Sequence, residues 1–276
     1  MTHALTPVLS PTLAILVLAF VPAAQARGVS VIGDLVREHT VSPGQTVEAS
    51  MDLRNDLEQP VTTRIYQTDY TFTAGGENRY PEPGTLARSN APWIAVTPSL
   101  VRIAEGSSAH VEYRMTVPND PGLAGTYWSL LMVEPQAAPT ADVPAAAGEQ
   151  PRARFVTVVR YAVIIITHVG DSGKAELRFT DKRIVTDERG GRVLRLTVEN
   201  TGERSLRPAV WAELYDDSGT KIARLEGPRK YIFPQCSTTF DMDLSTVGPG
   251  PRKALVIADA GGEALFGAQY DLQIAE

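Results

Sequence analysis

The sequence predicts an all-β protein built from two tandem β-sandwich domains, and three observations support this. Glycine (22 residues) and proline (20 residues) are plentiful, while aromatic residues make up only 7% of the chain, as expected for many short strands joined by turns. Between residues 27 and 135 apolar and polar residues alternate, and no helical period exceeds two turns. The two halves also share one plan: an alternating strand ending at Asn55 or Asn200, a polar turn, a proline and the next strand.

The first domain is predicted to span residues 27–169. Turns at Ser42-Pro43-Gly44 and at Asn55-Asp56 punctuate its beginning, because glycine, proline and asparagine favour the backbone angles that turns require. A longer polar excursion passes through Pro81-Glu82-Pro83-Gly84. The expected strands cover residues 47–53, 61–68, 93–96, 100–103, 111–117, 126–133 and 155–169.

The second domain is predicted to span residues 170–276, after a break at Gly170-Asp171-Ser172-Gly173. Asp216-Asp217-Ser218-Gly219 is a hairpin turn within it. The expected strands cover residues 175–180, 194–198, 210–215, 221–225, 230–233, 238–244, 254–258 and 266–274. This number of short strands in about a hundred residues is typical of an immunoglobulin-like sandwich.

The long strand at residues 155–169, FVTVVRYAVIIITHV, is the most unusual segment, because it is apolar on both faces. A strand of a two-layer sandwich should alternate apolar and polar residues. Its second apolar face therefore needs a cover, which is either the second domain or a partner protein. The two rows are Phe155, Val159, Tyr161, Val163 and Ile165 on one face, and Val156, Val158, Ala162, Ile164 and Ile166 on the other.

Residues 134–152 precede this strand and consist mainly of alanine and proline. A segment without large apolar side chains buries too little surface to offset its ordering entropy. The sequence therefore predicts a mobile loop, which is either a passive surface loop or a segment that lets the long strand accept partners.

The N-terminus has the pattern of a cleaved export signal. The apolar run Leu13–Val21 is too short for a bilayer, which requires about 20 residues. Pro22 follows, and then Ala24-Gln25-Ala26 as a small-x-small cleavage site, which predicts a signal peptide at residues 1–26 cleaved after Ala26. No later segment approaches transmembrane length without a charge, so the mature chain is not expected to span a membrane. Cys236 is the only cysteine, which excludes an internal disulfide.

Composition and motif spacing argue against several functional classes. The net charge of −6 and the absence of a long basic cluster argue against nucleic-acid binding. His39, His110 and His168 are scattered and not at metal-ligand spacing, so no metal or other cofactor is predicted. The segment Gly170–Gly173 lacks the histidine context of a protease nucleophile loop, and no catalytic residues are predicted. We therefore expect a protein that is not an enzyme.

The tryptophans allow two interpretations. Trp93, Trp128 and Trp211 lie in strand patterns and are expected in the core. If they instead formed an exposed line on one face, they could stack against sugars in a carbohydrate-binding module.

Short motifs follow one another in a characteristic order over residues 28–169. They are Leu53-Arg54-Asn55, Ala91-Pro92-Trp93-Ile94, Val101-Arg102-Ile103, Glu105-Gly106, Val111-Glu112-Tyr113-Arg114, Val117-Pro118, Gly125-Thr126-Tyr127-Trp128 and Val133-Glu134-Pro135. In this order they resemble the N-terminal domain of the periplasmic pilus-assembly chaperones of the PapD type. The resemblance is that of a divergent member of this family. The second half matches only as a sandwich of the right size.

The resemblance implies a mechanism in which the long strand pairs with an exported subunit whose own β-sandwich is incomplete. It implies a periplasmic location, and an outer-membrane assembly protein is a further expected partner. The residues expected to bind the subunit are Phe155, Thr157, Val159, Tyr161, Val163, Ile165, Arg37 and Arg160.

Chaperones of this family also hold the subunit's terminal carboxylate with an arginine of the first strand and a lysine of the long strand. By spacing, the arginine position falls near His39, with Arg37 on the same face. The lysine position falls near Ala162 or Val163, and Arg160 is the nearest cation. The predicted function is thus that of a periplasmic chaperone-like assembly factor. The alternative is a non-catalytic structural or adhesive module of the cell envelope.

Overall fold

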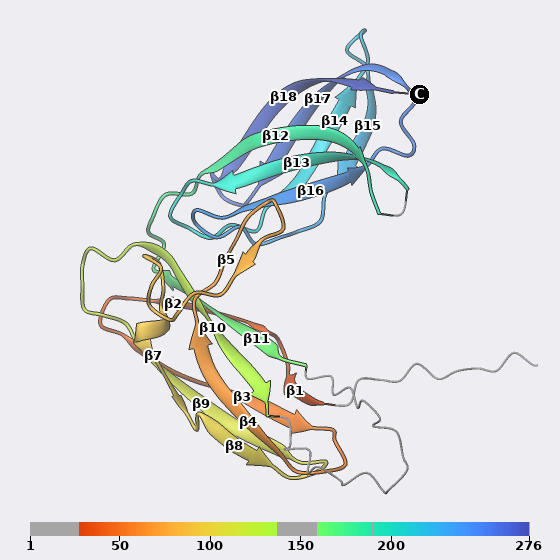
Figure 1. The fold of residues 1–276 in the computed structure, drawn as a ribbon. Helices are drawn as coiled ribbons and strands as arrows, with labels where there is room; N and C mark the ends of the chain where they lie inside the picture. Colours follow the sequence, from red (N-terminus) through yellow and green to blue (C-terminus); the bar gives the residue numbers. More distant parts are fainter. Residues whose placement is uncertain (1–27, 137–158, 189, 276) are drawn as a thin grey trace, which may run out of the picture.

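The computed structural model describes residues 28–136, 159–188 and 190–275, and within these ranges the protein is nearly all β. Its sheets form two separate sandwiches, one containing strands up to Val169 and the other starting at Leu177 (Figure 1). The only helical element of the described residues is the short 3-10 helix η1 (Ala91–Trp93). The prediction of an all-β protein with two sandwiches is confirmed.

The first sandwich packs a four-stranded sheet against a five-stranded sheet. In the order of hydrogen bonding, the first sheet contains β1 (Val29–Ile32), β3 (Thr46–Asn55), β9 (Ser108–Thr116) and β7 (Ile94–Thr97). The second contains β2 (Val36–Val41), β11 (Tyr161–Val169), β10 (Gly125–Pro135), β4 (Val61–Thr68) and β8 (Leu100–Ile103). A small hairpin of β5 (Thr71–Phe72) and β6 (Asn78–Arg79) extends towards the second sandwich (Figure 1).

The pairing of β11 differs along its two edges. β10 pairs with β11 in antiparallel fashion along all of β11, from Tyr161 to Val169. β2 pairs with the other edge in parallel fashion, but only from Ile164 to Val169. The chain crosses between the two sheets after β1, so β2 joins β11 part-way along its length. No described strand therefore pairs with the β2-side edge of β11 from Tyr161 to Val163.

The core of the first sandwich consists of alternate residues from both sheets, as period-two patterns require. Its completely buried members include Leu53, Val111, Met115, Leu131, Val133, Val163 and Ile165.

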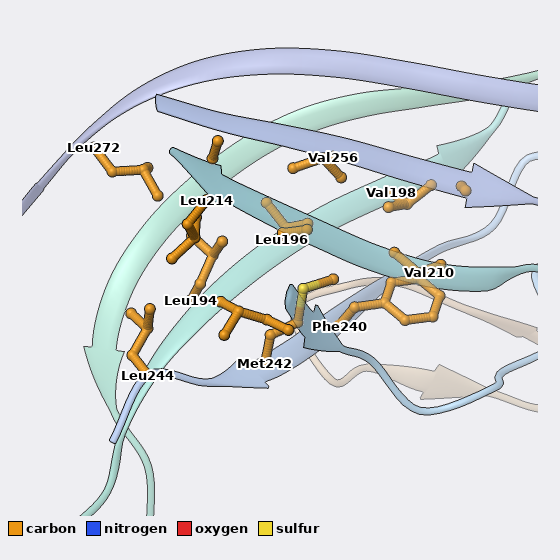
Figure 2. Close-up of a cluster of buried hydrophobic side chains, with 14 of the residues drawn as sticks. Leu194, Leu196, Val198, Val210, Leu214, Phe240, Met242, Leu244, Val256 and Leu272 are labelled. Atoms are coloured by element: carbon orange, nitrogen blue, oxygen red, sulfur yellow. The ribbon is translucent and has the colours of Figure 1, made fainter. Parts of the chain in front are cut away.

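The second sandwich packs a three-stranded sheet against a four-stranded sheet. The first contains β12 (Leu177–Thr186), β13 (Arg192–Asn200) and β16 (Ser237–Asp243). The second contains β15 (Lys221–Glu226), β14 (Ala209–Tyr215), β17 (Gly250–Asp259) and β18 (Leu265–Ile274). Figure 2 shows the side chains that meet between the sheets, among them Leu194, Leu196, Val210, Leu214, Phe240, Met242 and Val256.

Asn55 and Asn200 make matching contacts in the two halves, and both are completely buried. Each side-chain amide donates to the carbonyl oxygen four residues later, at 2.9 Å for Asn55 and 2.7 Å for Asn200. Each also donates to a carbonyl distant in sequence, that of Ile103 or of Ile232. Each side-chain oxygen accepts from the backbone N–H two residues later, at 3.0 Å and 2.9 Å. The repeated sequence plan therefore has a physical basis, because each asparagine fixes the turn that follows its strand.

Some predicted segments differ from the structure or lie outside the described residues. The predicted strand at residues 230–233 is only an isolated bridge between Leu206 and Ile232. The predicted loop at residues 134–152 begins too early, since Glu134 and Pro135 belong to β10. The predicted signal peptide, residues 137–152 of that loop and residues 155–158 of the predicted long strand lie outside the described residues.

Within the described ranges, the structure contains no helix with the length and apolar character needed to cross a membrane.

Candidate functional site

In the structure, the face of β11 that was predicted to contact a partner points into the core, and the opposite face points outward. Val163 and Ile165, predicted to contact a partner, are 0% exposed and belong to the core of the first sandwich. The prediction is therefore wrong for these two side chains. The outward row is instead Ala162, Ile164 and Ile166, which alternate with them. Because both rows are apolar, the sequence pattern could not decide which one faces the core.

The other predicted partner-binding residues of the long strand lie before or at its start. Phe155 and Thr157 are outside the described residues. Val159 is 38% exposed, and Arg160 is exposed beside it. Tyr161 is half-buried and packs against the edge of the core. A role for Val159, Arg160 and Tyr161 in binding stays a prediction.

The second domain covers one end of the outward face. Ile166 and its neighbour on β10, Trp128, are buried in a small cluster with Phe233 and Cys236 of the second domain. The rings of Trp128 and Phe233 stack with their centroids 4.8 Å apart. The β5–β6 hairpin adds to this interface, because the N–H of Ala74 donates to Ser237 Oγ at 2.9 Å. Among the residues that the structure describes, the chain therefore covers the surplus apolar surface at the end of β11 nearest the second domain.

The three tryptophans lie in separate places and do not form one line. Trp128 is 4% exposed in the interdomain cluster. Trp93 is half-buried, and its ring lies 4.7 Å from that of Tyr127. Trp211 is half-buried on β14, with the Arg224 guanidinium 4.5 Å above its ring. As expected, Trp128 is buried and Trp93 packs against the core of the first sandwich, whereas Trp211 faces outward.

A polar network also joins the two domains at the same end of β11. The Tyr231 hydroxyl donates to Glu38 Oε1 at 2.5 Å, and His168 Nε2 lies 3.0 Å from Glu38 Oε2. Because a carboxylate only accepts, His168 donates through Nε2. Burial by itself would raise the pKa of Glu38, but the bonds from Tyr231 and His168 outweigh burial and hold the pKa below its usual value. The guanidinium of Arg207 lies over the Tyr231 ring, at 5.0 Å from its centroid.

We expect the interdomain network to weaken in acid. Because the pKa of Glu38 is lowered on folding, its stabilising effect is present above its ordinary value of 4.5 and is lost as the pH falls through the lowered value. Glu38→Gln should lower the unfolding temperature at neutral pH. The difference from wild type should shrink below about pH 4.5. Thermal unfolding of both proteins between about pH 3 and pH 7 measures this difference in unfolding temperature. A difference that stays constant over this range would contradict the role given to the Glu38 carboxylate.

Arg37 and Arg160, the two cations expected to bind a subunit, do not lie together. Arg37 lies opposite Ile165 in the parallel pairing, on the inward face, and its Nε is buried without a partner among the described residues. His39 is on the same face, and its Nε2 lies 2.9 Å from the hydroxyl of Tyr113. Burial and the nearby Arg37 charge lower the pKa of His39. Arg160 is instead on the outward face, so the two predicted cations lie on opposite sides of the sheet.

The backbone of β11 is open beside Ala162. On the β2 side, the N–H of Ile164 donates to the carbonyl oxygen of Leu35 at 2.8 Å. Alternate residues of a strand direct their N–H and C=O groups to the same side. The N–H and C=O of Ala162 therefore point towards this edge, where the described chain has no strand opposite them. Leu35, which is 39% exposed, lies at the end of this opening.

A groove of about 700 Å³ lies on the outward face next to this open edge, and we call it the Ala162 groove. Its floor follows one row of the sheet, because Met132 lies opposite both Ala162 and Tyr66. Its lining consists of Arg64, Tyr66, Gln67, Thr68, Tyr80, Pro81, Glu82, Pro83, Met132, Arg160 and Ala162. The sequence pattern does not reveal this groove, because the segment around Pro81 indicates only a polar excursion.

The buried carboxylate of Asp69 holds the loop that forms one wall of the groove. It is 0% exposed and accepts hydrogen bonds from the N–H of Gly84 at 3.1 Å, from the N–H of Leu86 at 2.7 Å and from Ser89 Oγ at 2.5 Å. The N–H of Asp69 in turn donates to the carbonyl oxygen of Pro81 at 3.0 Å. The wall is therefore fixed by the fold.

Comparisons with known proteins find similarity at the level of structure. No protein-family model and no curated protein matches the chain. A chain from a chaperone–tip adhesin complex of CFA/I fimbriae matches with a TM-score of 0.45 at 13% identity, over 90% of this chain and 100% of that one. The class 5 fimbriae chaperone CfaA matches with a TM-score of 0.46 at 12% identity, over 88% and 98%. A chain from the complex of the Salmonella enterica SafA pilin with the SafB chaperone matches with a TM-score of 0.42 at 15% identity, over 91% and 99%. Because these TM-scores are below 0.5, we base the function proposed below on the residues of this chain.

Proposed function

We propose that this protein is a periplasmic chaperone-like assembly factor. It binds exported surface or pilus subunits whose β-sandwich is incomplete, by pairing one of their strands with the open edge of β11. The observation that carries this proposal is the edge beside Ala162, which β2 leaves unpaired. An unpaired edge presents backbone donors and acceptors that a partner strand can use.

The position of the opening limits how a partner strand can lie. β2 occupies the β11 edge from Ile164 onwards, so an added strand must end before Val36. It would lie in line with β2 and next to the half-exposed side chain of Ala162. The predicted export of the chain fits this function, because a periplasmic factor meets its subunits after they cross the inner membrane.

The alternative function is that of a structural or adhesive envelope module. The interdomain cluster around Trp128 and Ile166 favours this alternative, since it shows the chain covering part of its own apolar face. The two functions differ in what they require of the open edge, because a module that only packs its two domains together does not use the Ala162 backbone.

The experiment that separates them is the substitution Ala162→Pro. Proline removes the N–H that points to the open edge and places its ring there, while the pairing of Ala162 with β10 does not use that N–H. The matched control is Arg102→Pro, at an exposed position of β8 at the other edge of the same sheet. The protein is co-expressed in the periplasm with the small β-rich exported proteins encoded by neighbouring genes, and complexes are isolated and titrated.

We expect wild type and Arg102→Pro to form a one-to-one complex. Ala162→Pro should bind at least about tenfold more weakly, because it loses a backbone hydrogen bond and blocks the edge. Equal binding by Ala162→Pro would overturn strand pairing at this edge.

A further inference from the structure

We propose that the Ala162 groove binds one large apolar side chain of the paired partner strand, and that the small size of Ala162 provides access to it. This inference rests on the proposed function and adds the partner feature that the site recognises. The occupant is a leucine-sized or aromatic side chain, located on the partner strand directly opposite Ala162.

The geometry of the sheet places such a side chain beside the groove. Ala162, Met132 and Tyr66 are neighbours on three consecutive strands and project from the same face. A strand added to the open edge of β11 contributes a fourth side chain to this row, with its Cβ about 5 Å from that of Ala162. Since Ala162 carries only a methyl group, a longer side chain can lie across it and reach Met132.

The next row along the sheet offers no such access. There the outward residue of β11 is Ile164, whose edge neighbour is already Val36 of the same chain. The β10 residue opposite Ile164 is Leu130, whose side chain is 3% exposed. The partner strand can therefore reach the face of the sheet at Ala162 but not at Ile164.

The chemistry of the groove suits an uncharged apolar group. Its floor is the row of Ala162, Met132 and Tyr66, and Pro81 and Pro83 contribute to its walls. Tyr80 is 58% exposed, and its ring stacks on that of Tyr70 at 5.6 Å. Apolar floors surrounded by polar rims are typical of sites that bury a side chain of a partner.

The charged residues around the groove balance one another. Arg160 lies 3.8 Å from Glu134, which is its neighbour on β10. The Arg64 guanidinium lies over the Tyr66 ring at 4.6 Å, and Glu82 stands in the opposite wall. Two cations and two carboxylates sum to no formal charge, so the rim does not favour a charged occupant.

The test uses synthetic peptides in place of the unknown partner. End-blocked seven-residue peptides alternate threonine and valine, and both their second and sixth residues are phenylalanine, leucine, alanine or aspartate. In either strand direction one of these residues can then lie opposite Ala162 while the peptide ends before β2. Binding to the purified mature protein is measured by fluorescence anisotropy with wild type, Ala162→Phe, Ala162→Pro and the control Ala95→Phe. Ala95 is an exposed residue of β7, on the opposite sheet.

We expect wild type and Ala95→Phe to bind the phenylalanine and leucine peptides at least about tenfold more tightly than the alanine and aspartate peptides. Ala162→Phe should lose this preference, because its own ring fills the groove. Its affinity for the alanine peptide should stay within about twofold of wild type, since the backbone edge is unchanged.

Three other outcomes would each overturn the inference. If wild type binds all four peptides equally and Ala162→Pro binds none, strand pairing holds but the groove does not select. If wild type binds no peptide, the open edge does not accept strands and the proposed function fails as well. If light scattering shows a dimer that Ala162→Phe dissociates, and no peptide is preferred, the occupant is a second copy of this chain.

Discussion

Val163→Asp is expected to unfold the first domain, whereas Ala162→Asp, one residue away, is expected to leave it folded. Val163 is 0% exposed in the core, so the substitution buries a carboxylate without a partner. We expect a loss of at least about 4 kcal/mol in the free energy of unfolding. Ala162 is half-exposed on the outward face, and its substitution should cost less than about 1 kcal/mol. Urea denaturation of the two variants measures both values.

This pair of variants also separates stability from binding. Ala162→Asp should remain folded yet bind a partner strand poorly, because it places a charge at the entrance of an apolar groove. If Ala162→Asp cost more stability than Val163→Asp, the assignment of the two faces of β11 would be wrong.

Asp69→Ala is expected to cause the second largest loss in the free energy of unfolding. The carboxylate is completely buried and accepts four hydrogen bonds, from Gly84, Thr85, Leu86 and Ser89, so its removal leaves those donors without this acceptor. We expect a loss of about 3 kcal/mol in the free energy of unfolding. Amide hydrogen exchange at Gly84 and Leu86 should become faster, because the wall of the Ala162 groove loosens.

The matched control for Asp69→Ala is Asp56→Ala. The Asp56 carboxylate is exposed and pairs with Arg54 on the surface at 2.7 Å, a contact that contributes little to stability. Equal stability losses in the two variants, or unchanged exchange at Gly84 and Leu86 in Asp69→Ala, would show that Asp69 does not hold the wall.

Much of the fold could be predicted because its signals are local. Alternation identified strands such as Leu194, Leu196 and Val198, which all face the core. The repeated asparagines indicated two similar halves, and Asn55 and Asn200 do make matching contacts. Turn residues placed most boundaries, because glycine and proline act through the backbone of their own segment.

The functional surface could be predicted only in part, because it depends on contacts between distant segments. Period two separates the rows of β11 but does not say which row meets the other sheet, so Val163 and Ile165 were assigned to the wrong face. The parallel pairing of β2 with only part of β11 follows from the chain crossing between sheets, which no short sequence pattern encodes. The groove depends on the contact of Asp69 with a loop fifteen or more residues later.

The inward position of Arg37 also depends on pairing between segments that are distant in the sequence. Its face is set by the register of β2 against Ile165, so spacing along the sequence could not show that it lies away from Arg160. The interdomain cluster likewise joins Trp128 to Phe233, which are far apart in the chain. The sequence left open whether the second domain or a partner covers the apolar surplus. The structure assigns the end around Ile166 to the second domain, and we propose a partner for the end at Ala162.

Residue-resolved amide hydrogen exchange at Ala162, with and without a bound subunit, tests the open edge most directly. The N–H of Ala162 should exchange rapidly in the free protein and at least about tenfold more slowly in the complex, while Val163, already paired with β10, should be protected in both states. An Ala162 amide that is protected in the free protein, or that exchanges equally fast in the complex, would contradict strand pairing at this edge.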